Sequence, residues 1–207
     1  LSRTDDILTL DQNVHVLRGG QTLEGDRAVA RLSPNEEVVR SIELRGSATV
    51  NGEGASLRSM SGREIDLDYA DDGQLLEGAK LVGDATVSMP AVGTSTPGRQ
   101  VRGERLDFLF APDGAITGLT AREGVQLTLP ASDVSPSRAV KARTLDGLGE
   151  PGRGLTSLRF SGDVHDEEDD EDRRAEQLGG DADVVDRRHQ ADADHVDDRR
   201  EGDQEQA

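Results

Sequence analysis

The chain of 207 residues carries 42 acidic and 24 basic side chains, a net charge of −18, and no cysteine. The acidic balance opposes nucleic-acid binding, because Lys and Arg contacts to phosphates supply most of that affinity. The lack of cysteine excludes disulfides, thiolate catalysis and thiolate metal sites. No stretch of the sequence approaches the ~18 consecutive apolar residues that predict a transmembrane helix.

Charge divides the chain into two parts. Residues 165–207 hold 18 acidic and 6 basic side chains and few large apolar residues. Such a segment buries too little apolar surface to offset the entropy of ordering. We therefore expect a disordered acidic tail over 165–207, either a native extension or the product of a shifted reading frame. Residues 1–164 are long enough for one domain with a hydrophobic core.

The first predicted element covers residues 7–16. Ile7-Leu8-Thr9-Leu10 and Val14-His15-Val16 are similar to the second strand of the repeat described next, which indicates part of an earlier copy. Because the chain begins at Leu1 rather than Met, we infer a fragment or processed chain. A signal segment or a membrane anchor upstream is compatible with that interpretation.

One pattern then occurs four times: an apolar residue, any residue, a small residue, two mostly polar residues and another apolar residue. The copies begin at Leu23, Met60, Val101 and Val140. Dipeptides that supply or preset the φ angles of tight turns follow in register at Pro34-Asn35, Asp72-Gly73, Asp113-Gly114 and Pro151-Gly152. Glycines that indicate a bulge inside the next strand follow at Gly46, Gly83, Gly124 and Gly162. Each copy is therefore predicted to be a β-hairpin.

Apolar and polar residues alternate in the predicted strands, as in Ile65, Leu67 and Tyr69 against Asp66 and Asp68. Period two with one apolar face is typical of a half-buried antiparallel strand. One hairpin is marginal in water, so the hairpins must stack to bury a continuous apolar face. We expect an all-β, elongated and twisted jelly-roll, whose interior either leaves a slot for acyl chains or closes into a dry core. Patterning alone favours the closed core.

Several segments resemble the OstA-like periplasmic proteins of lipopolysaccharide transport. The resemblance covers most of residues 7–164 and rests on short motifs: Val101-Arg-Gly-Glu-Arg-Leu-Asp-Phe, Asp113-Gly114, Gly118-Leu119 leading to Glu123-Gly124-Val125-Gln126-Leu127, and the 78–87 segment Gly-Ala-Lys-Leu-Val-Gly-Asp-Ala-Thr-Val. The acidic run after Gly162-Asp163-Val164 departs from that family, in which a further strand is expected.

The resemblance implies a periplasmic, non-enzymatic lipid carrier or bridge component, and it is compatible with an anchor to the inner membrane through a segment missing from this chain. Its partners would be the acyl chains of lipopolysaccharide or lipid A, other jelly-roll proteins through edge-to-edge strand contacts, and further copies joined end to end. We expect no catalytic residue, no metal and no cofactor. The candidates for acyl contact on the interior face are Ile65, Leu67, Tyr69, Leu81, Val87, Leu106, Phe108, Phe110, Leu127 and Leu129.

Two other function classes compete with a lipid carrier. A structural β-repeat, such as a filament or a surface stalk, would have a dry interior and bind no lipid. A carbohydrate-active domain is disfavoured, because Tyr69 is the only Tyr or Trp in the chain and no aromatic platform is available. The segment Gly147–Gly152 satisfies the G-x-G-x-x-G dinucleotide pattern, but it contains a hairpin turn and lacks a following helical pattern.

Overall fold

A computed structural model describes residues 2–4, 6–35, 37–52, 57–91, 98–131 and 136–168. Within these ranges the backbone forms eleven strands and no helix. The strands are β1 (Ser2–Thr4), β2 (Ile7–Arg18), β3 (Gln21–Leu32), β4 (Val39–Gly52), β5 (Ser59–Tyr69), β6 (Leu76–Met89), β7 (Arg99–Phe110), β8 (Ile116–Leu129), β9 (Arg138–Glu150), β10 (Gly154–Ser161) and β11 (His165–Glu168).

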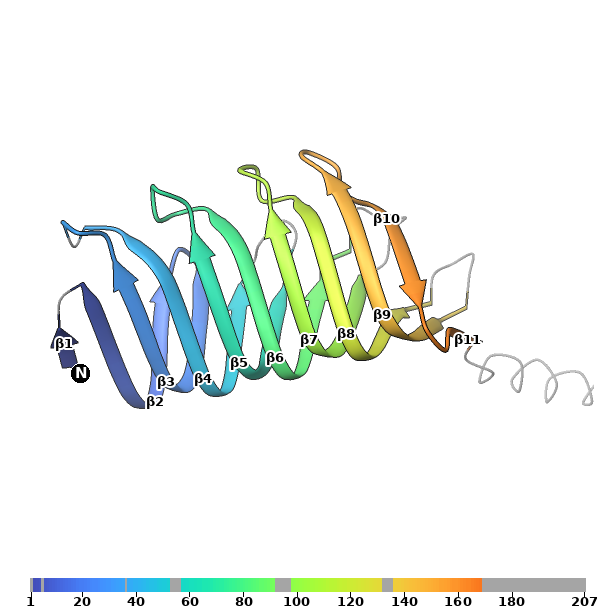
Figure 1. The fold of residues 1–207 in the computed structure, drawn as a ribbon, viewed down its shortest axis with the longest axis horizontal. Coiled ribbons are helices and arrows are strands. Elements are labelled where there is room, and N and C mark those ends of the chain that lie inside the picture. Colours follow the sequence, from blue (N-terminus) through green and yellow to red (C-terminus); the bar gives the residue numbers. More distant parts are fainter. Residues whose placement is uncertain are drawn as a thin grey trace, which may run out of the picture. The chain divides into compact units, whose positions relative to one another are not determined.

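These strands form one antiparallel sheet in which β1 to β10 follow one another in chain order (Figure 1). The predicted hairpins correspond to β3–β4, β5–β6, β7–β8 and β9–β10, and the element expected at 7–16 is β2. Each of the four predicted turn dipeptides lies between the two strands of its hairpin. The all-β class and the repeated hairpins predicted from the sequence are therefore confirmed, and the sheet does not close on itself.

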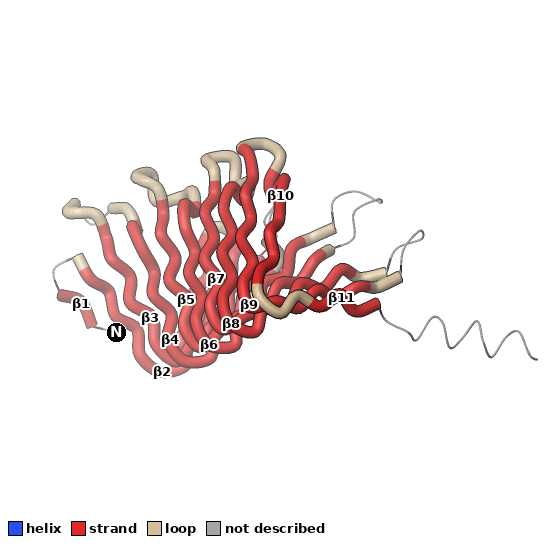
Figure 2. The backbone as a smooth tube through the Cα atoms, turned by 45° about the vertical axis from the view of Figure 1, so that its right-hand side comes forward, coloured by secondary structure: helices blue, strands red, loops and turns tan. Residues whose placement is uncertain are grey.

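Most strands bend sharply at one position (Figures 1 and 2). At each bend of β2, β4, β6 and β8, and between β10 and β11, two successive residues have positive φ. The pairs are Gln12 and Asn13, Gly46 and Ser47, Gly83 and Asp84, Glu123 and Gly124, and Gly162 and Asp163. The register shifts at the four bends inside strands. Gly46, Gly83 and Gly124 therefore lie at bulges that turn their strands, as the sequence indicated, whereas Gly162 lies in the connection between β10 and β11.

Because the bends are aligned, the sheet folds into two layers (Figure 2). We call the half with the hairpin turns the tip layer; it comprises residues 7–11, 27–32, 39–45, 64–69, 76–82, 105–110, 116–122, 144–150 and 154–161. We call the other half the base layer; it comprises residues 14–18, 21–24, 48–52, 59–62, 85–89, 99–103, 125–129, 138–142 and 165–168.

The small residue of the repeat lies opposite each bend, at Gly25, Gly62, Gly103 and Ala142. A Cβ atom on Gly25, Gly62 or Gly103 would lie 3.3 Å from the backbone oxygen of Arg45, Val82 or Arg122, respectively. That spacing is tight, and a larger side chain would press on the neighbouring strand. Close approach of two backbones at the bend is thus the reason for the small residue in the repeat.

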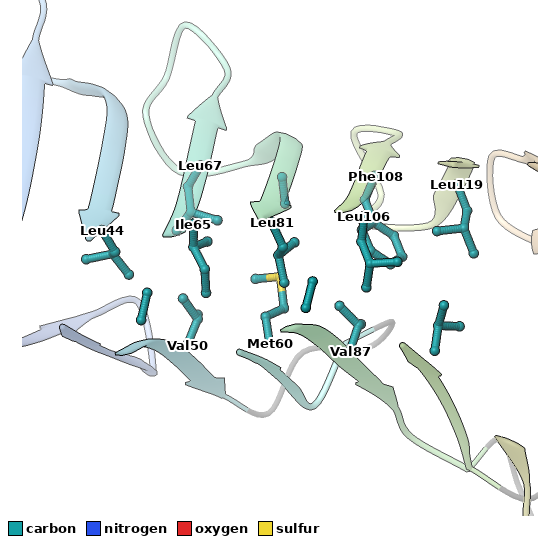
Figure 3. Packing of buried hydrophobic residues seen from close by; sticks show 14 of the residues in the cluster. Leu44, Val50, Met60, Ile65, Leu67, Leu81, Val87, Leu106, Phe108 and Leu119 are labelled. Atoms are coloured by element: carbon teal, nitrogen blue, oxygen red, sulfur yellow. The ribbon is translucent and has the colours of Figure 1, made fainter. Parts of the chain in front are cut away.

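The core lies between the two layers, as the labelled side chains of Figure 3 show. Cross-strand pairing aligns apolar residues into rows. One tip-layer row contains Leu10, Ala28, Leu44, Ile65, Leu81, Leu106, Ala121, Leu145 and Phe160. The base-layer row contains Val16, Leu23, Val50, Met60, Val87, Val101, Leu127, Val140 and, at its end, Asp166. Such rows bury a continuous apolar face that no single hairpin provides.

The sheet extends beyond residue 164, where the sequence placed the domain boundary. His165–Glu168 form β11, which pairs with Arg138–Lys141 of β9. The acidic composition predicted a disordered tail from residue 165, but a further strand follows there. Backbone ladder bonds do not depend on side-chain type. In addition, Arg138 pairs with Asp166, and Lys141 Nζ lies 2.7 Å from a carboxylate oxygen of Glu167. These opposite charges make an acidic strand acceptable at this edge. The remainder of the predicted tail, residues 169–207, lies outside the described residues.

Candidate functional site

All ten residues predicted to face the interior lie in rows between the layers. Ile65, Leu81 and Leu106 belong to the tip-layer row next to the bends. A second tip-layer row includes Leu67 and Phe108, while Tyr69 and Phe110 lie beside the turns, at the ends of β5 and β7. Val87 and Leu127 belong to the base-layer row, with Leu129 one inward position farther along β8. These ten residues therefore share the inward face of β5 to β8.

The centre of this interior is filled. Ile65, Leu81, Val87 and Leu106 have no exposed surface at all. No space large enough for a water molecule therefore touches them, in agreement with the closed core that the patterning favoured. An acyl chain would reach these four side chains only if the two layers moved apart.

The edge of the interior remote from the bends is less well covered; we call it the rim. Phe110 on the tip layer, and Met89 and Leu129 on the base layer, pack against the core but are only partly buried. Phe110 also stacks on Phe108, with ring centroids 6.3 Å apart and planes inclined by 17°. The rim thus offers accessible apolar surface that leads directly to the packed centre.

Arg18 connects the two layers at the rim. Its position two residues after Val16 places it on the inward face of β2 in the base layer. The guanidinium lies 4.0 Å from the centre of the Tyr69 ring in the tip layer, and Nη2 donates a hydrogen bond to the carbonyl oxygen of Gly73. A cation over an aromatic face is stabilising by about 0.5–2 kcal/mol. This contact therefore holds the rim closed near β2.

Tyr69 is buried, and its hydroxyl oxygen has no hydrogen-bond partner among the described residues. Burial raises the pKa of Tyr69, while the positive charge of Arg18 opposes part of that rise. An unpaired buried hydroxyl costs about 1–3 kcal/mol relative to one that is hydrogen-bonded.

Two further arginines lie on the inward face at the rim of the base layer. Arg99 precedes Val101 by two residues, and Arg138 precedes Val140 by two, so strand alternation places each on the face of the apolar row. Leu129 of β8 is the strand neighbour between them and pairs with Arg138. Arg138 forms an ion pair with Asp166, whereas the side chain of Arg99, which is half-buried, has no ion-pair partner among the described residues.

The outer face of the base layer is polar across its whole width. One cross-strand row contains His15, Glu24, Thr49, Ser61, Thr86, Arg102, Gln126, Lys141 and His165. His15 Nδ1 lies 3.0 Å from Glu24 Oε1, and Thr49 donates to the other Glu24 oxygen at 3.2 Å. A shallow hollow of about 740 Å³ beside this row is lined by charged and polar side chains such as Arg102, Glu104 and Glu123. This face is solvated, and its one large apolar side chain among the described residues is Leu17, which is 74% exposed.

The structure places the other sequence motifs in ordinary strand surroundings. Gly147–Gly152 lie at the end of β9 and in the turn to β10, so no helix N-terminus is present there to hold a phosphate. Among the described residues no three His, Cys, Asp or Glu side chains are grouped to hold a metal ion. Within the same ranges no helix is long and apolar enough to cross a bilayer.

Among the rim arginines, the sequence reasoning missed Arg18 and Arg138. It did single out Arg99, with Arg102, Arg105 and Lys141, as basic residues that either meet lipid phosphates at the rim or balance nearby acids on a polar face. A signal was present, since Arg99 and Arg138 each stand two residues before the first apolar residue of their copies, Val101 and Val140. Arg58 has the same spacing to Met60, but it lines a hollow of the outer face with Thr22 and Asn51.

Comparison of the chain with protein-family models and with curated proteins returned no match.

Proposed function

We propose that this protein is a non-enzymatic lipid carrier or bridge component of the lipopolysaccharide-transport type, which holds acyl chains between its two layers. The observation that carries the proposal is the folded sheet itself. Its inner face is apolar across the strands from β2 to β10, and it is reached through a rim where Phe110, Met89 and Leu129 are partly exposed. The motifs of residues 78–87 and 101–127, which resemble the OstA-like proteins, support the same class.

Affinity in this proposal comes from apolar burial. Each methylene group removed from water contributes about 0.8 kcal/mol before the costs of ordering. Because the central side chains are already packed, an acyl chain must enter at the rim and move the two layers apart. Its methylene groups then replace the contacts that the side chains of the two layers made with each other. The site therefore forms as the ligand enters, and affinity is lower than the buried area alone would give.

The sheet edges support the assembly expected of a bridge. One edge consists of β1 with β2, and the other consists of β10 with β11. An unpaired edge presents backbone N–H and C=O groups to a strand of another molecule. We therefore include edge-to-edge contacts with similar jelly-roll proteins or with a second copy, and a periplasmic location, in the proposal.

The proposal is tested by two substitutions on neighbouring residues of β8. Leu129→Asp places a charge on the inner face at the rim, and Thr128→Asp places the same charge on the outer face. We expect the full chain to retain purified lipopolysaccharide during gel filtration, Thr128→Asp to retain as much, and Leu129→Asp to lose most of it. Equal retention by both folded variants would show that the interior is not the lipid site.

A structural β-repeat without lipid binding is the second candidate. The filled centre favours it, because Ile65, Leu81, Val87 and Leu106 already bury one another completely. In that case the wild-type chain retains no lipid in the same experiment, and its self-association is unchanged when lipid is added.

A further inference from the structure

The rim of the base layer carries positive charge beside accessible apolar surface. Arg99 and Arg138 stand on either side of Leu129, one strand away on each side. Adjacent strands lie about 4.8 Å apart, so the backbones of the two arginines are separated by roughly 10 Å. Two arginines on strands at that backbone spacing, with an apolar side chain between them, suit a molecule that has an anionic head and an apolar chain.

Among the described residues, no side chain compensates the charge of Arg99. Its side chain is half-buried, it lies beside Met89 and Leu129, and no acidic group pairs with it in the described part of the chain. A partly desolvated guanidinium without a counter-ion is costly, and an anion of the ligand would remove that cost. Arg102, three residues later, lies on the outer face and donates instead to the Thr86 hydroxyl at 3.4 Å.

The charge of Arg138, in contrast, is compensated from within the chain. Asp166 of β11 occupies the last position of the base-layer row, where the preceding strands carry Val87, Val101 and Leu127, and it pairs with Arg138. Both side chains of this pair are 45% exposed. An acidic residue at an inward position is unexpected from the repeat, and its carboxylate stands where an anionic head would contact Arg138.

We propose that Arg99 and Arg138 form a subsite for the anionic head, a phosphate monoester or a group of similar charge, of an amphiphile whose chain passes beside Leu129 into the interior. Asp166 is an internal competitor that occupies Arg138 while the subsite is empty. The inference rests on the proposed lipid-carrying function and specifies the ligand class that the same interior accepts. The accessible surface of Leu129 and Met89 favours an amphiphile over a free anion.

The test measures binding to the full 207-residue chain by titration calorimetry. The probes are monomeric dodecyl phosphate, dodecyl maltoside, which has the same chain and an uncharged head, and inorganic phosphate. We expect dodecyl phosphate to bind about tenfold more tightly than dodecyl maltoside, and inorganic phosphate to bind far more weakly than either. Equal binding of dodecyl phosphate and inorganic phosphate would overturn the amphiphile subsite.

Four variants assign the effect to residues. Arg99→Gln and Arg138→Gln should each weaken dodecyl phosphate binding about three- to tenfold and leave dodecyl maltoside unchanged. Arg102→Gln, the matched change on the outer face of β7, should leave both unchanged. Asp166→Asn should strengthen dodecyl phosphate binding about threefold, since it removes the internal competitor, and a misfolded variant would not produce a gain.

The outcomes separate the two proposals. If both amphiphiles bind with equal affinity and the arginine variants have no effect, the subsite is wrong while the lipid-carrying interior stands. If neither amphiphile binds, the proposed function fails and the subsite fails with it. A loss with Arg102→Gln as large as that with Arg99→Gln would show general electrostatic attraction, which also overturns the subsite.

Discussion

The inner position of Phe108 can be tested against its outward neighbour. Phe108 is 1% exposed and lies between Ala79 and Leu119 in a tip-layer row, whereas Leu109 is 62% exposed. Truncating a buried Phe to Ala removes its burial and leaves a cavity, at a cost of about 3–5 kcal/mol. Loss of the stacked contact with Phe110 accounts for about 0.5–1.5 kcal/mol of that cost. Surface truncations usually change stability by about 0.5 kcal/mol or less.

We therefore expect Phe108→Ala to lower the free energy of unfolding by about 3–5 kcal/mol, and Leu109→Ala by about 0.5 kcal/mol. The assay is urea unfolding followed by circular dichroism, with fluorescence of Tyr69, the chain's single tyrosine, as a second probe. Coincident transitions by the two probes justify a two-state analysis. Phe108→Leu should fall between the two alanine variants. Equal losses for Phe108→Ala and Leu109→Ala would refute the two-layer packing.

Three further predictions concern the bends, Tyr69 and a turn. Gly83→Ala should destabilise the protein more than Gly124→Ala does. Both glycines have positive φ, but only at Gly83 would a Cβ atom approach another residue, at 2.6 Å from Arg63 Cβ. Thermal unfolding of the two variants measures the difference. Because burial raises the pKa of Tyr69, the free energy of unfolding should decrease as pH rises above about 10. Ultraviolet titration of this single tyrosine measures its pKa directly. Tyr69→Phe should remove the decrease in stability. Backbone N–H groups of Gln74 and Leu75 donate hydrogen bonds to the Asp72 carboxylate and lower its pKa. The stabilisation that ionised Asp72 gives to the 70–75 turn should therefore be present near neutral pH and lost in acid. Asp72→Ala should make the free energy of unfolding fall less steeply as the pH is lowered.

Much of the fold follows from local sequence, because turn chemistry and strand alternation are local properties. Asp72-Gly73 and Asp113-Gly114 mark turns through Gly φ angles of +65° and +78°. The alternation of Leu106 and Phe108 against Asp107 identified the inner face of β7. With these two signals, pairing of neighbouring strands leaves one register that buries every apolar row.

Other features depend on contacts between distant residues. Gln12 and Asn13 bend β2 without any glycine, so the two-residue bend was visible only where Gly occupied one of its positions. The contact of Arg18 with Tyr69 joins strands that are not neighbours in the sheet, and alternation within a strand carries no information about it. β11 was missed because composition indicated a tail, while the free edge of β9 and the charges of Arg138 and Lys141 provided partners for an acidic strand.

The most direct test of the central claim is photo-crosslinking of lipopolysaccharide to the full chain. A photoreactive residue is placed at position 110, which is partly buried on the inner face at the rim, or at position 109, which points outward from the same strand. A lipid-bearing interior predicts labelling from position 110 and little or none from position 109. Labelling only from position 109, or from neither position in a folded protein, would contradict it.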